Sequence, residues 1–134
     1  MFGIVIVAHG GLAKEFLSAV EHVVGPQEGV RAISIGSDVQ LDEMRSEIQS
    51  VADQVDIGHG AVVVADLMGA SPANLAVQAC AKENRAVLCG ANVAMLVKLV
   101  RSRKQDMNVA IESAIETGKK HILTPAAIKA TSSL

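Results

Sequence analysis

Runs of β-branched residues alternate along this chain with segments in which apolar residues recur every three or four positions. A continuous β-branched run is typical of a strand that is buried on both faces, and the three-to-four spacing is typical of an amphipathic helix. The first strand covers residues 3–8, and the helical pattern after it ends at Gly25-Pro26. Further strands are predicted at residues 30–35, 61–65, 86–89 and, briefly, 121–124.

Helical patterns fill the intervals between these strands. One predicted helix begins with Ser71 as N-cap and Pro72 at the first helical position, and the last helix ends at Gly118. Strands and helices that alternate in this way predict one α/β domain over residues 1–134, with about 130–134 as a loose tail. We expect a mostly parallel sheet of four strands that is covered by helices on both faces.

The composition favours a compact domain that associates with further copies of itself. The chain has 134 residues, of which 50% are hydrophobic and 19% are charged. A domain of this size can bury about two-thirds of its surface without help from a metal or a disulfide. The charged content is below the roughly 25% expected of a soluble domain, which indicates that a second copy or another partner covers some apolar surface. We therefore expect a homo-oligomer.

Charge and aromatic content exclude several kinds of partner. Twelve Lys and Arg against 14 Asp and Glu give a net charge of −2, which provides no basic footprint for nucleic acid. Only Phe2 and Phe16 are aromatic, so rings for stacking on a base or a sugar are lacking. The longest uncharged stretch, 67–81, is too short to span a bilayer, and the apolar start lacks the features of a signal peptide. We expect a cytoplasmic protein.

The sequence indicates neither a metal nor a cofactor. Cys80 and Cys89 fit inert thiols in a reducing compartment, and the four histidines share no ligand spacing. A phosphate-binding P-loop and a dinucleotide-binding fingerprint are both missing. The basic residues Arg101, Arg103 and Lys104 are interpreted as a solvated helix end.

The strongest chemical signal comes where two buried strands end. His9-Gly10-Gly11 follows the first strand, and Asp66 follows the third. Ligands of a parallel sheet bind at the carboxyl ends of its strands, so these side chains should share one edge with Ser71. A carboxylate that accepts one ring N–H would fix the imidazole tautomer and leave the other nitrogen free as a nucleophile. The helix N-terminus after Gly11 would stabilise an anion placed there.

Simpler interpretations of these residues stay open. His9 could be a hydrogen-bonded histidine at the edge of the sheet, Asp66 could bond turn amides, and Ser71 could act only as an N-cap. A serine hydrolase would also use Ser71 with His9 and Asp66, but Pro72 stands where that enzyme needs a backbone N–H for its oxyanion hole. This alternative is therefore disfavoured.

A receiver-type signalling domain is a second alternative, because it would be phosphorylated on a residue in the place of Asp66. Such a domain needs Mg²⁺, held by an acidic pair after the first strand. This chain has His9-Gly10-Gly11 there, which offers no carboxylate to a hard cation. The sequence therefore favours phosphohistidine over phosphoaspartate.

Three segments together resemble the IIA component of the mannose family of the bacterial phosphoenolpyruvate:sugar phosphotransferase system. They are residues 4–10, 64–74 and 90–96, and the resemblance extends over nearly the whole chain. It implies that His9 is phosphorylated by the histidine phosphocarrier protein HPr and hands the phosphoryl group to a IIB protein. Asp66 would orient the ring, and Ser71 would contact the phosphoryl group. The residues expected to bind the phosphoryl group or a partner protein are Gly10, Gly11, Met68, Gly69 and Asn92.

The resemblance also implies a homodimer in which the last strand, near residues 121–124, crosses to the sheet of the partner. Contact with the membrane would be indirect, through permease components. Met68 stands where many relatives have an aromatic residue, and Ala94 where many have proline; both belong to loops around the site, where they would affect the choice of partner more than the chemistry. The sequence is compatible with a role in sugar uptake and phosphorylation or with that of a solitary regulatory IIA protein.

Overall fold

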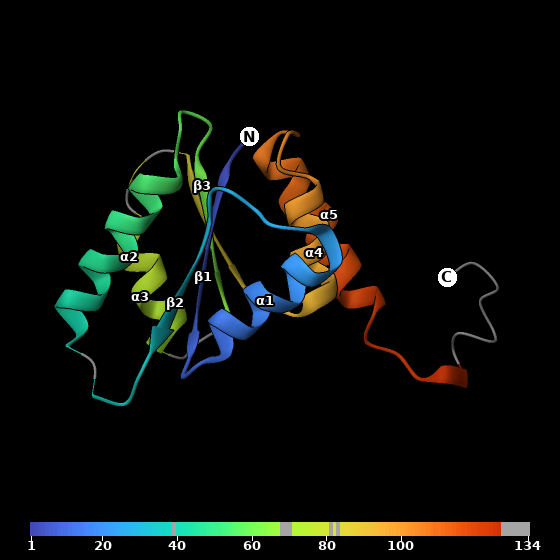
Figure 1. Ribbon diagram of the computed structural model, residues 1–134, viewed down its shortest axis with the longest axis horizontal. Coiled ribbons are helices and arrows are strands. Elements are labelled where there is room, and N and C mark those ends of the chain that lie inside the picture. The colour runs from blue at the N-terminus through green and yellow to red at the C-terminus, as the bar shows by residue number, and fades with distance from the viewer. Residues whose placement is uncertain (39, 68–70, 81, 83, 127–134) are drawn as a thin grey trace.

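The computed structural model describes residues 1–126 apart from 39, 68–70, 81 and 83 (Figure 1). The strands in this part of the chain are β1 (Gly3–His9), β2 (Val30–Ile35), β3 (Ala61–Ala65) and β4 (Arg85–Cys89). The helices are α1 (Leu12–Val24), α2 (Leu41–Val55), α3 (Ser71–Ala79), α4 (Val93–Arg101) and α5 (Met107–Lys120). Strands and helices alternate from β1 to α4, as the hydrophobic pattern predicts.

The strands form one parallel sheet in the order β2-β1-β3-β4. The two central strands, β1 and β3, are buried at every position except His9. Their β-branched residues face helices on both sides, which explains why neither strand shows a polar alternation. The expected four-stranded parallel sheet is confirmed.

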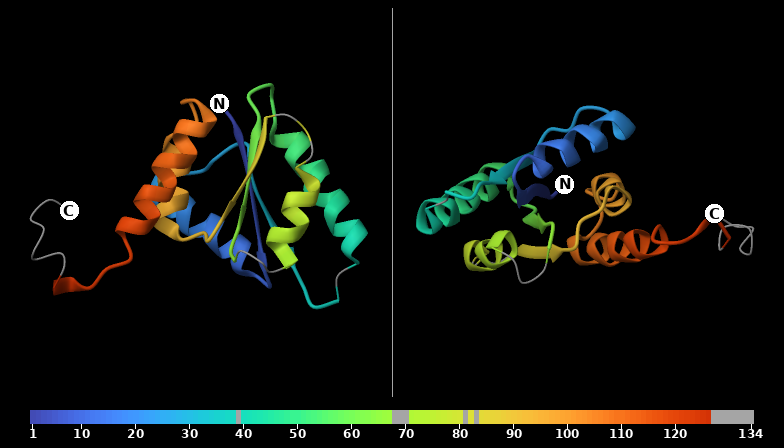
Figure 2. Two further views of the ribbon diagram at one scale, coloured as in Figure 1. Left: turned by 180° about the vertical axis from the view of Figure 1, so that it is seen from behind. Right: turned by 90° about the horizontal axis from the view of Figure 1, so that it is seen from below.

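The sheet lies between two layers of helices (Figure 2, left). Helices α2 and α3 cover one face, where they pack against residues such as Val5, Val7 and Val63. Helices α1, α4 and α5 cover the other face, where they pack against Ile4 and Ile6. Because β2 lies beside β1 and β4 lies on the far side of β3, the chain leaves β1 and β3 in opposite directions, through α1 on one face and α3 on the other. The strand order thus reverses between β1 and β3, and such a point is where parallel sheets bind ligands at their carboxyl edge.

The helix that the sequence predicts to stop at Gly118 continues through it to Lys120. Asp106 caps its start, since the side-chain carboxylate accepts a hydrogen bond from the Val109 N–H at 3.3 Å. Gly118 is buried inside the helix, and a Cβ built on it would lie 3.1 Å from the Cβ of Met95. The prediction of a stop was wrong because the glycine permits close packing of α5 against α4.

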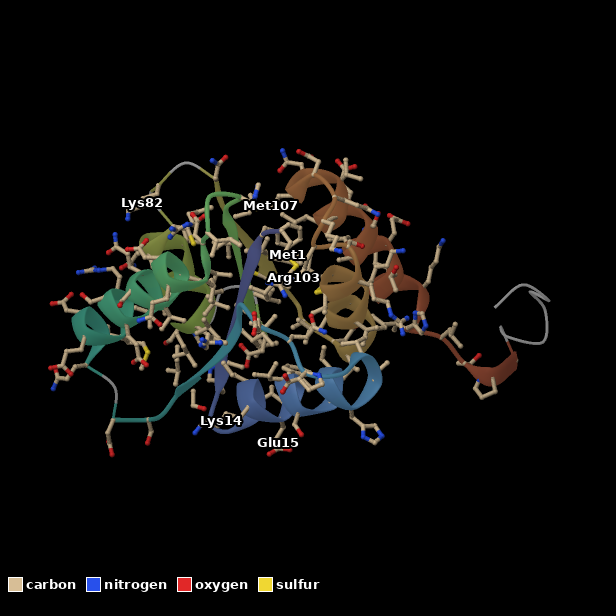
Figure 3. All side chains as sticks on the ribbon, turned by 45° about the horizontal axis from the view of Figure 1, so that its top comes forward. Met1, Lys14, Glu15, Lys82, Arg103 and Met107 are labelled. Carbon is tan, nitrogen blue, oxygen red and sulfur yellow. The ribbon has the colours of Figure 1, made fainter. Side chains whose placement is uncertain are left out.

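Arg103 is not part of a solvated cluster as the sequence suggests, since its residue is only 5% exposed. Its Nε donates a hydrogen bond to the Phe2 carbonyl at 2.9 Å, and its Nη1 donates to the Glu28 carbonyl at 2.7 Å. Figure 3 shows Arg103 close to Met1 at the amino edge of the sheet, opposite the start of α1. The guanidinium joins the beginnings of β1 and β2 to the end of α4.

Residues 121–124, the expected fifth strand, form a turn and irregular backbone in the single chain instead of a strand. They lead away from the helical layers (Figure 1), with Ile122 76% exposed. A strand needs a neighbouring strand with which to pair, and within the described residues the sheet contains only β1 to β4. Its exchange into the sheet of a second copy remains a prediction.

Candidate functional site

His9 and Asp66 meet at the carboxyl edge of the sheet, at the bottom of Figure 1. His9 is the last residue of β1, and Asp66 directly follows β3. The two strands pair in parallel with Val7 opposite Ala65, so the residues that follow these two positions lie at the same edge. The expected placement of the imidazole beside the carboxylate is therefore what the structure shows.

Asp66 holds His9 through two hydrogen bonds. Its Oδ2 lies 2.8 Å from the ring Nδ1 and accepts the backbone N–H of His9 at 3.1 Å. Its Oδ1 accepts the N–H of Leu67 at 2.9 Å. Because a carboxylate accepts from an N–H, Nδ1 carries the proton and Nε2 keeps its lone pair. The His9 side chain is 50% exposed, whereas that of Asp66 is 8% exposed.

The surroundings of Asp66 favour its charged form. Burial alone would raise the pKa of this carboxyl, but the hydrogen bonds from the His9 ring, the His9 backbone and Leu67 outweigh it and lower the pKa below its usual value. Asp66 is thus a carboxylate at neutral pH. It can stabilise a positive charge that develops on the imidazole ring.

Two glycines lead from His9 into α1. Gly10 has a φ of +54°, a conformation that favours glycine, and its N–H donates to the Ile35 carbonyl at 2.9 Å. Gly11 is the N-cap of α1. A Cβ added to either glycine would meet no atom within 4 Å, so the space around them is open. The helix α1 begins at Leu12, three residues after His9, and the amides of its first turn favour an anion.

Ser71 lies at the same edge of the sheet as His9. It is exposed and is the first residue of α3, which follows β3. Met68 and Gly69, which the sequence also assigns to the site, lie outside the described residues. The structure places Ser71 at this edge, and its contact with a phosphoryl group stays a prediction.

Asn92 lies in a loop that borders the site, and its expected part in binding the phosphoryl group or a partner stays a prediction. Its side chain caps α4 by accepting the Met95 N–H at 2.9 Å, and its Nδ2 donates to the Gly118 carbonyl at 3.2 Å. Its loop still borders the site, because the Ala91 N–H donates to the carbonyl of Ala65 at 3.2 Å, next to Asp66. The backbone of this loop, and not the Asn92 amide, faces the end of β3.

The structure adds exposed apolar residues that the sequence analysis did not identify. Leu12 at the start of α1 is 41% exposed, Leu67 after Asp66 is 58% exposed, and Val93 at the start of α4 is 39% exposed. Each directly follows a polar or glycine residue of the carboxyl edge, and apolar side chains exposed together mark contact surfaces. In the sequence, the feature that could have identified these three exposed residues is an apolar residue that immediately follows a turn.

In the described residues, no group of three or more His, Cys, Asp and Glu side chains is arranged to hold a metal ion. No helix in this part of the chain is long and apolar enough to cross a membrane. Within the described residues, this edge combines the imidazole of His9, the carboxylate of Asp66 and the start of α1.

The model of the EIIA-man family, described as the fructose IIA component of the phosphotransferase system (PTS), matches residues 3–117. The chain belongs to this family. By family it is thus a IIA component of the PTS.

Relatives and solved structures agree with this family. The chain is 29% identical over 122 residues to the mannose-specific EIIAB component of the PTS from Escherichia coli K12, which covers 89% of this chain. It spans only 38% of the length of that relative. The structure of the PTS component EIIA from Streptococcus agalactiae is similar with a TM-score of 0.85 and 26% identity, over 95% of this chain and 99% of that one.

A mannose/sorbose-specific IIA subunit from Enterococcus faecalis has the same fold, with a TM-score of 0.82 and 22% identity over 92% of this chain and 93% of that one. The resemblance inferred from the three sequence segments is therefore confirmed at the level of family and fold.

Proposed function

We propose that the chain is a phosphocarrier that accepts a phosphoryl group from HPr on Nε2 of His9 and passes it to a IIB protein. The observation that carries this proposal is the 2.8 Å hydrogen bond between Asp66 Oδ2 and His9 Nδ1. This bond occupies one ring nitrogen and leaves the other, on a half-exposed side chain, with its lone pair.

In the proposed transfer, Nε2 of His9 attacks the phosphorus of the phosphohistidine of HPr. The new bond joins Nε2 to phosphorus while the bond from phosphorus to the HPr imidazole breaks, and that imidazole leaves with the electron pair. His9 becomes a phosphorylated ring with a positive charge, which the Asp66 carboxylate stabilises. Transfer to the IIB protein is the same reaction in the opposite direction, with the acceptor in the place of HPr.

The edge around His9 supplies groups for the phosphoryl oxygens. The amides at the start of α1 follow Gly11, and the Ser71 hydroxyl lies at the start of α3. Both helix ends carry partial positive charge, which favours the transferred anion. Leu12, Leu67 and Val93 would then contact the partner protein around the reacting nitrogen.

The two alternative functions find less support in this geometry. The side chain of Asp66 is 8% exposed and both its oxygens accept hydrogen bonds, so it is poorly placed to receive a phosphoryl group as a receiver aspartate does. Pro72, the second residue of α3, has no N–H to give to the oxyanion hole of a hydrolase that uses Ser71.

The wider role follows from the same proposal. A IIA phosphocarrier that acts with HPr works in the cytoplasm and reaches the membrane only through permease components. It would serve sugar uptake and phosphorylation, or report the phosphorylation state as a regulatory IIA protein.

A second copy would complete a homodimer by placing its residues 121–124 beside β4. Beside that strand lies a groove lined by Val87, Leu88, Cys89, Ile115 and Ile122.

Phosphorylation on a single histidine is the direct test. Incubation with HPr, enzyme I and phosphoenolpyruvate should add one phosphate per chain, and His9→Ala should abolish it. The matched control is His121→Ala, because His121 is also exposed but its Nδ1 lies 2.9 Å from the Thr117 carbonyl oxygen instead of a carboxylate. Persistence of the label in His9→Ala would end the proposal.

The stability of the phosphorylated bond gives a second test. A phosphoryl group on an imidazole survives alkali and is lost in mild acid, whereas an acyl phosphate on aspartate is lost in alkali as well. We expect the labelled protein to keep its phosphate in alkali. Loss of the label there would move it to Asp66 and the chain to the receiver class.

A further inference from the structure

One side chain joins the ends of two helices beside the site. Asn92 Oδ1 accepts the N–H of Met95 in the first turn of α4, and Asn92 Nδ2 donates to the carbonyl of Gly118 in the last turn of α5. Backbone groups at helix ends lack partners within their own helix. Asn92 satisfies one such donor and one such acceptor, and so fixes the start of α4 against the end of α5.

Gly118 provides the space for this bridge. It is buried, and a Cβ added to it would lie 3.3 Å from Asn92 Nδ2 as well as 3.1 Å from Met95 Cβ. Both distances are shorter than ordinary van der Waals contacts, so a larger residue must displace Asn92 or Met95. The backbone of α5 therefore approaches the Asn92 side chain as closely as a glycine allows.

The loop that carries Asn92 is attached to the strand that leads to Asp66. Gly90 has a φ of +84°, which turns the chain sharply after β4. The next residue, Ala91, donates its N–H to the carbonyl of Ala65 at 3.2 Å, and Ala65 directly precedes Asp66. Asn92 follows at once, so the position of Ala91 against Ala65 depends on where Asn92 is held.

We infer that Asn92 is a positioning residue for phosphoryl transfer at His9. Its bridge between α4 and α5 holds the loop of residues 90–92 against the end of β3, beside the pair formed by His9 and Asp66. In this inference it acts through the backbone of that loop, because its oxygen and its nitrogen each hold a backbone group at a helix end. This inference rests on the proposed function.

Two substitutions disturb the bridge from opposite sides. Asn92→Asp keeps the acceptor that caps α4, removes the donor to Gly118 and puts a carboxylate oxygen near its carbonyl. Gly118→Ala keeps the asparagine side chain itself unchanged but crowds its Nδ2. Each should slow transfer from phosphorylated HPr to His9 by about tenfold, since small displacements of a positioned group cost this much or more. The amide of Ala91 should exchange with solvent faster by a similar factor.

The double variant should be no slower than the slower single variant, because both changes break the same bridge. Asn108→Asp and Glu116→Ala are the matched controls. Both residues are exposed on α5, and both variants should transfer at the wild-type rate. Thermal unfolding and the ¹⁵N shifts of the His9 ring, which report its tautomer, separate a positioning effect from a general loss of stability.

A wild-type transfer rate and unchanged Ala91 exchange in Gly118→Ala would overturn the inference. Slowing in Asn92→Asp alone would overturn it too, and would indicate direct contact between Asn92 and the phosphoryl group or HPr. If the wild-type chain takes no phosphate on His9, the proposed function fails. Hydrogen exchange of the Ala91 amide and the ¹⁵N shifts of the His9 ring, measured in the same variants, would still show whether Asn92 positions the pair formed by His9 and Asp66.

Discussion

Asp66 Oδ2 accepts both the ring Nδ1–H and the backbone N–H of His9, at 2.8 and 3.1 Å. A single carboxylate oxygen thus fixes the main chain and the side chain of the same residue. The imidazole cannot rotate without losing a charge-assisted hydrogen bond, and such bonds are among the stronger ones in proteins.

The first prediction is that Asp66→Asn slows phosphoryl transfer to His9 by about 10²–10⁴-fold. Asparagine cannot stabilise the positive ring, and its amide nitrogen cannot accept the Nδ1–H. The rate is measured by rapid mixing with phosphorylated HPr. Asp38→Asn is the control, because Asp38 is an exposed acid after β2. A wild-type rate in Asp66→Asn would remove Asp66 from the mechanism.

The second prediction concerns acid stability at the opposite edge of the sheet. The hydrogen bond from the Gly58 N–H lowers the pKa of Asp56 against the effect of burial, and Arg85 and Gly60 add to the lowering. A pKa that is lower in the folded state than its unfolded value of about 3.9 stabilises the fold above that pH. This stabilisation is lost as the pH falls through the folded pKa.

Asp56→Asn should therefore lower the free energy of unfolding at pH 7 by about 1–3 kcal/mol, and the difference from wild type should shrink toward pH 3 and below. Urea unfolding at several pH values measures it. Asp42→Asn serves as the control, because the side chain of Asp42 is 88% exposed. A difference that stays constant with pH would contradict this account of Asp56.

The third prediction is that Arg103→Met lowers the free energy of unfolding by about 2–3 kcal/mol. The substitution leaves the Phe2 and Glu28 carbonyls without the donors that reach them from Arg103. Arg101→Met, at an exposed position two residues earlier, should change stability by less than about 0.5 kcal/mol. Equal losses in the two variants would show that the buried hydrogen bonds do not account for the effect.

The fourth prediction is that the chain is a dimer, with about twice the 13.9 kDa of one copy by light scattering. Ile122→Glu should give monomers at micromolar concentration, because it charges the segment expected to cross to the partner. Ile57→Glu is the control, since Ile57 is 71% exposed, similar to Ile122 at 76%, but lies at the other edge of the sheet. A dimer that survives Ile122→Glu, or removal of the chain from His121 onward, would rule out the exchanged segment.

Much of the fold could be predicted because its signals are local. The β-branched runs of β1 and β3 identify buried strands, and two parallel neighbours must bring the residues that follow them to one edge. This reasoning placed His9 beside Asp66 without any knowledge of the structure. The register of these two strands, with Val7 opposite Ala65, brings the two residues to the same edge.

The failures came where the deciding contact is distant in the sequence. A glycine near a helix end looks the same whether it stops the helix or admits a neighbour, and Gly118 meets Asn92, 26 residues away. Arg103 looks solvated because its acceptors, Phe2 and Glu28, are 101 and 75 residues away. The exchange of residues 121–124 into a second copy stays a prediction, because a strand also requires a second edge with which to pair.

Because only Nε2 of His9 is free, HPr and the IIB protein must bind the chain one after the other in the proposed transfer. Since Asp66 occupies Nδ1, one nitrogen must both receive the phosphoryl group and give it away. Donor and acceptor therefore have to cover the same few residues in turn, and no complex can contain both at once on one copy of the chain. Excess unphosphorylated HPr would then compete with the acceptor, so the flow through the relay would depend on the ratio of the two proteins.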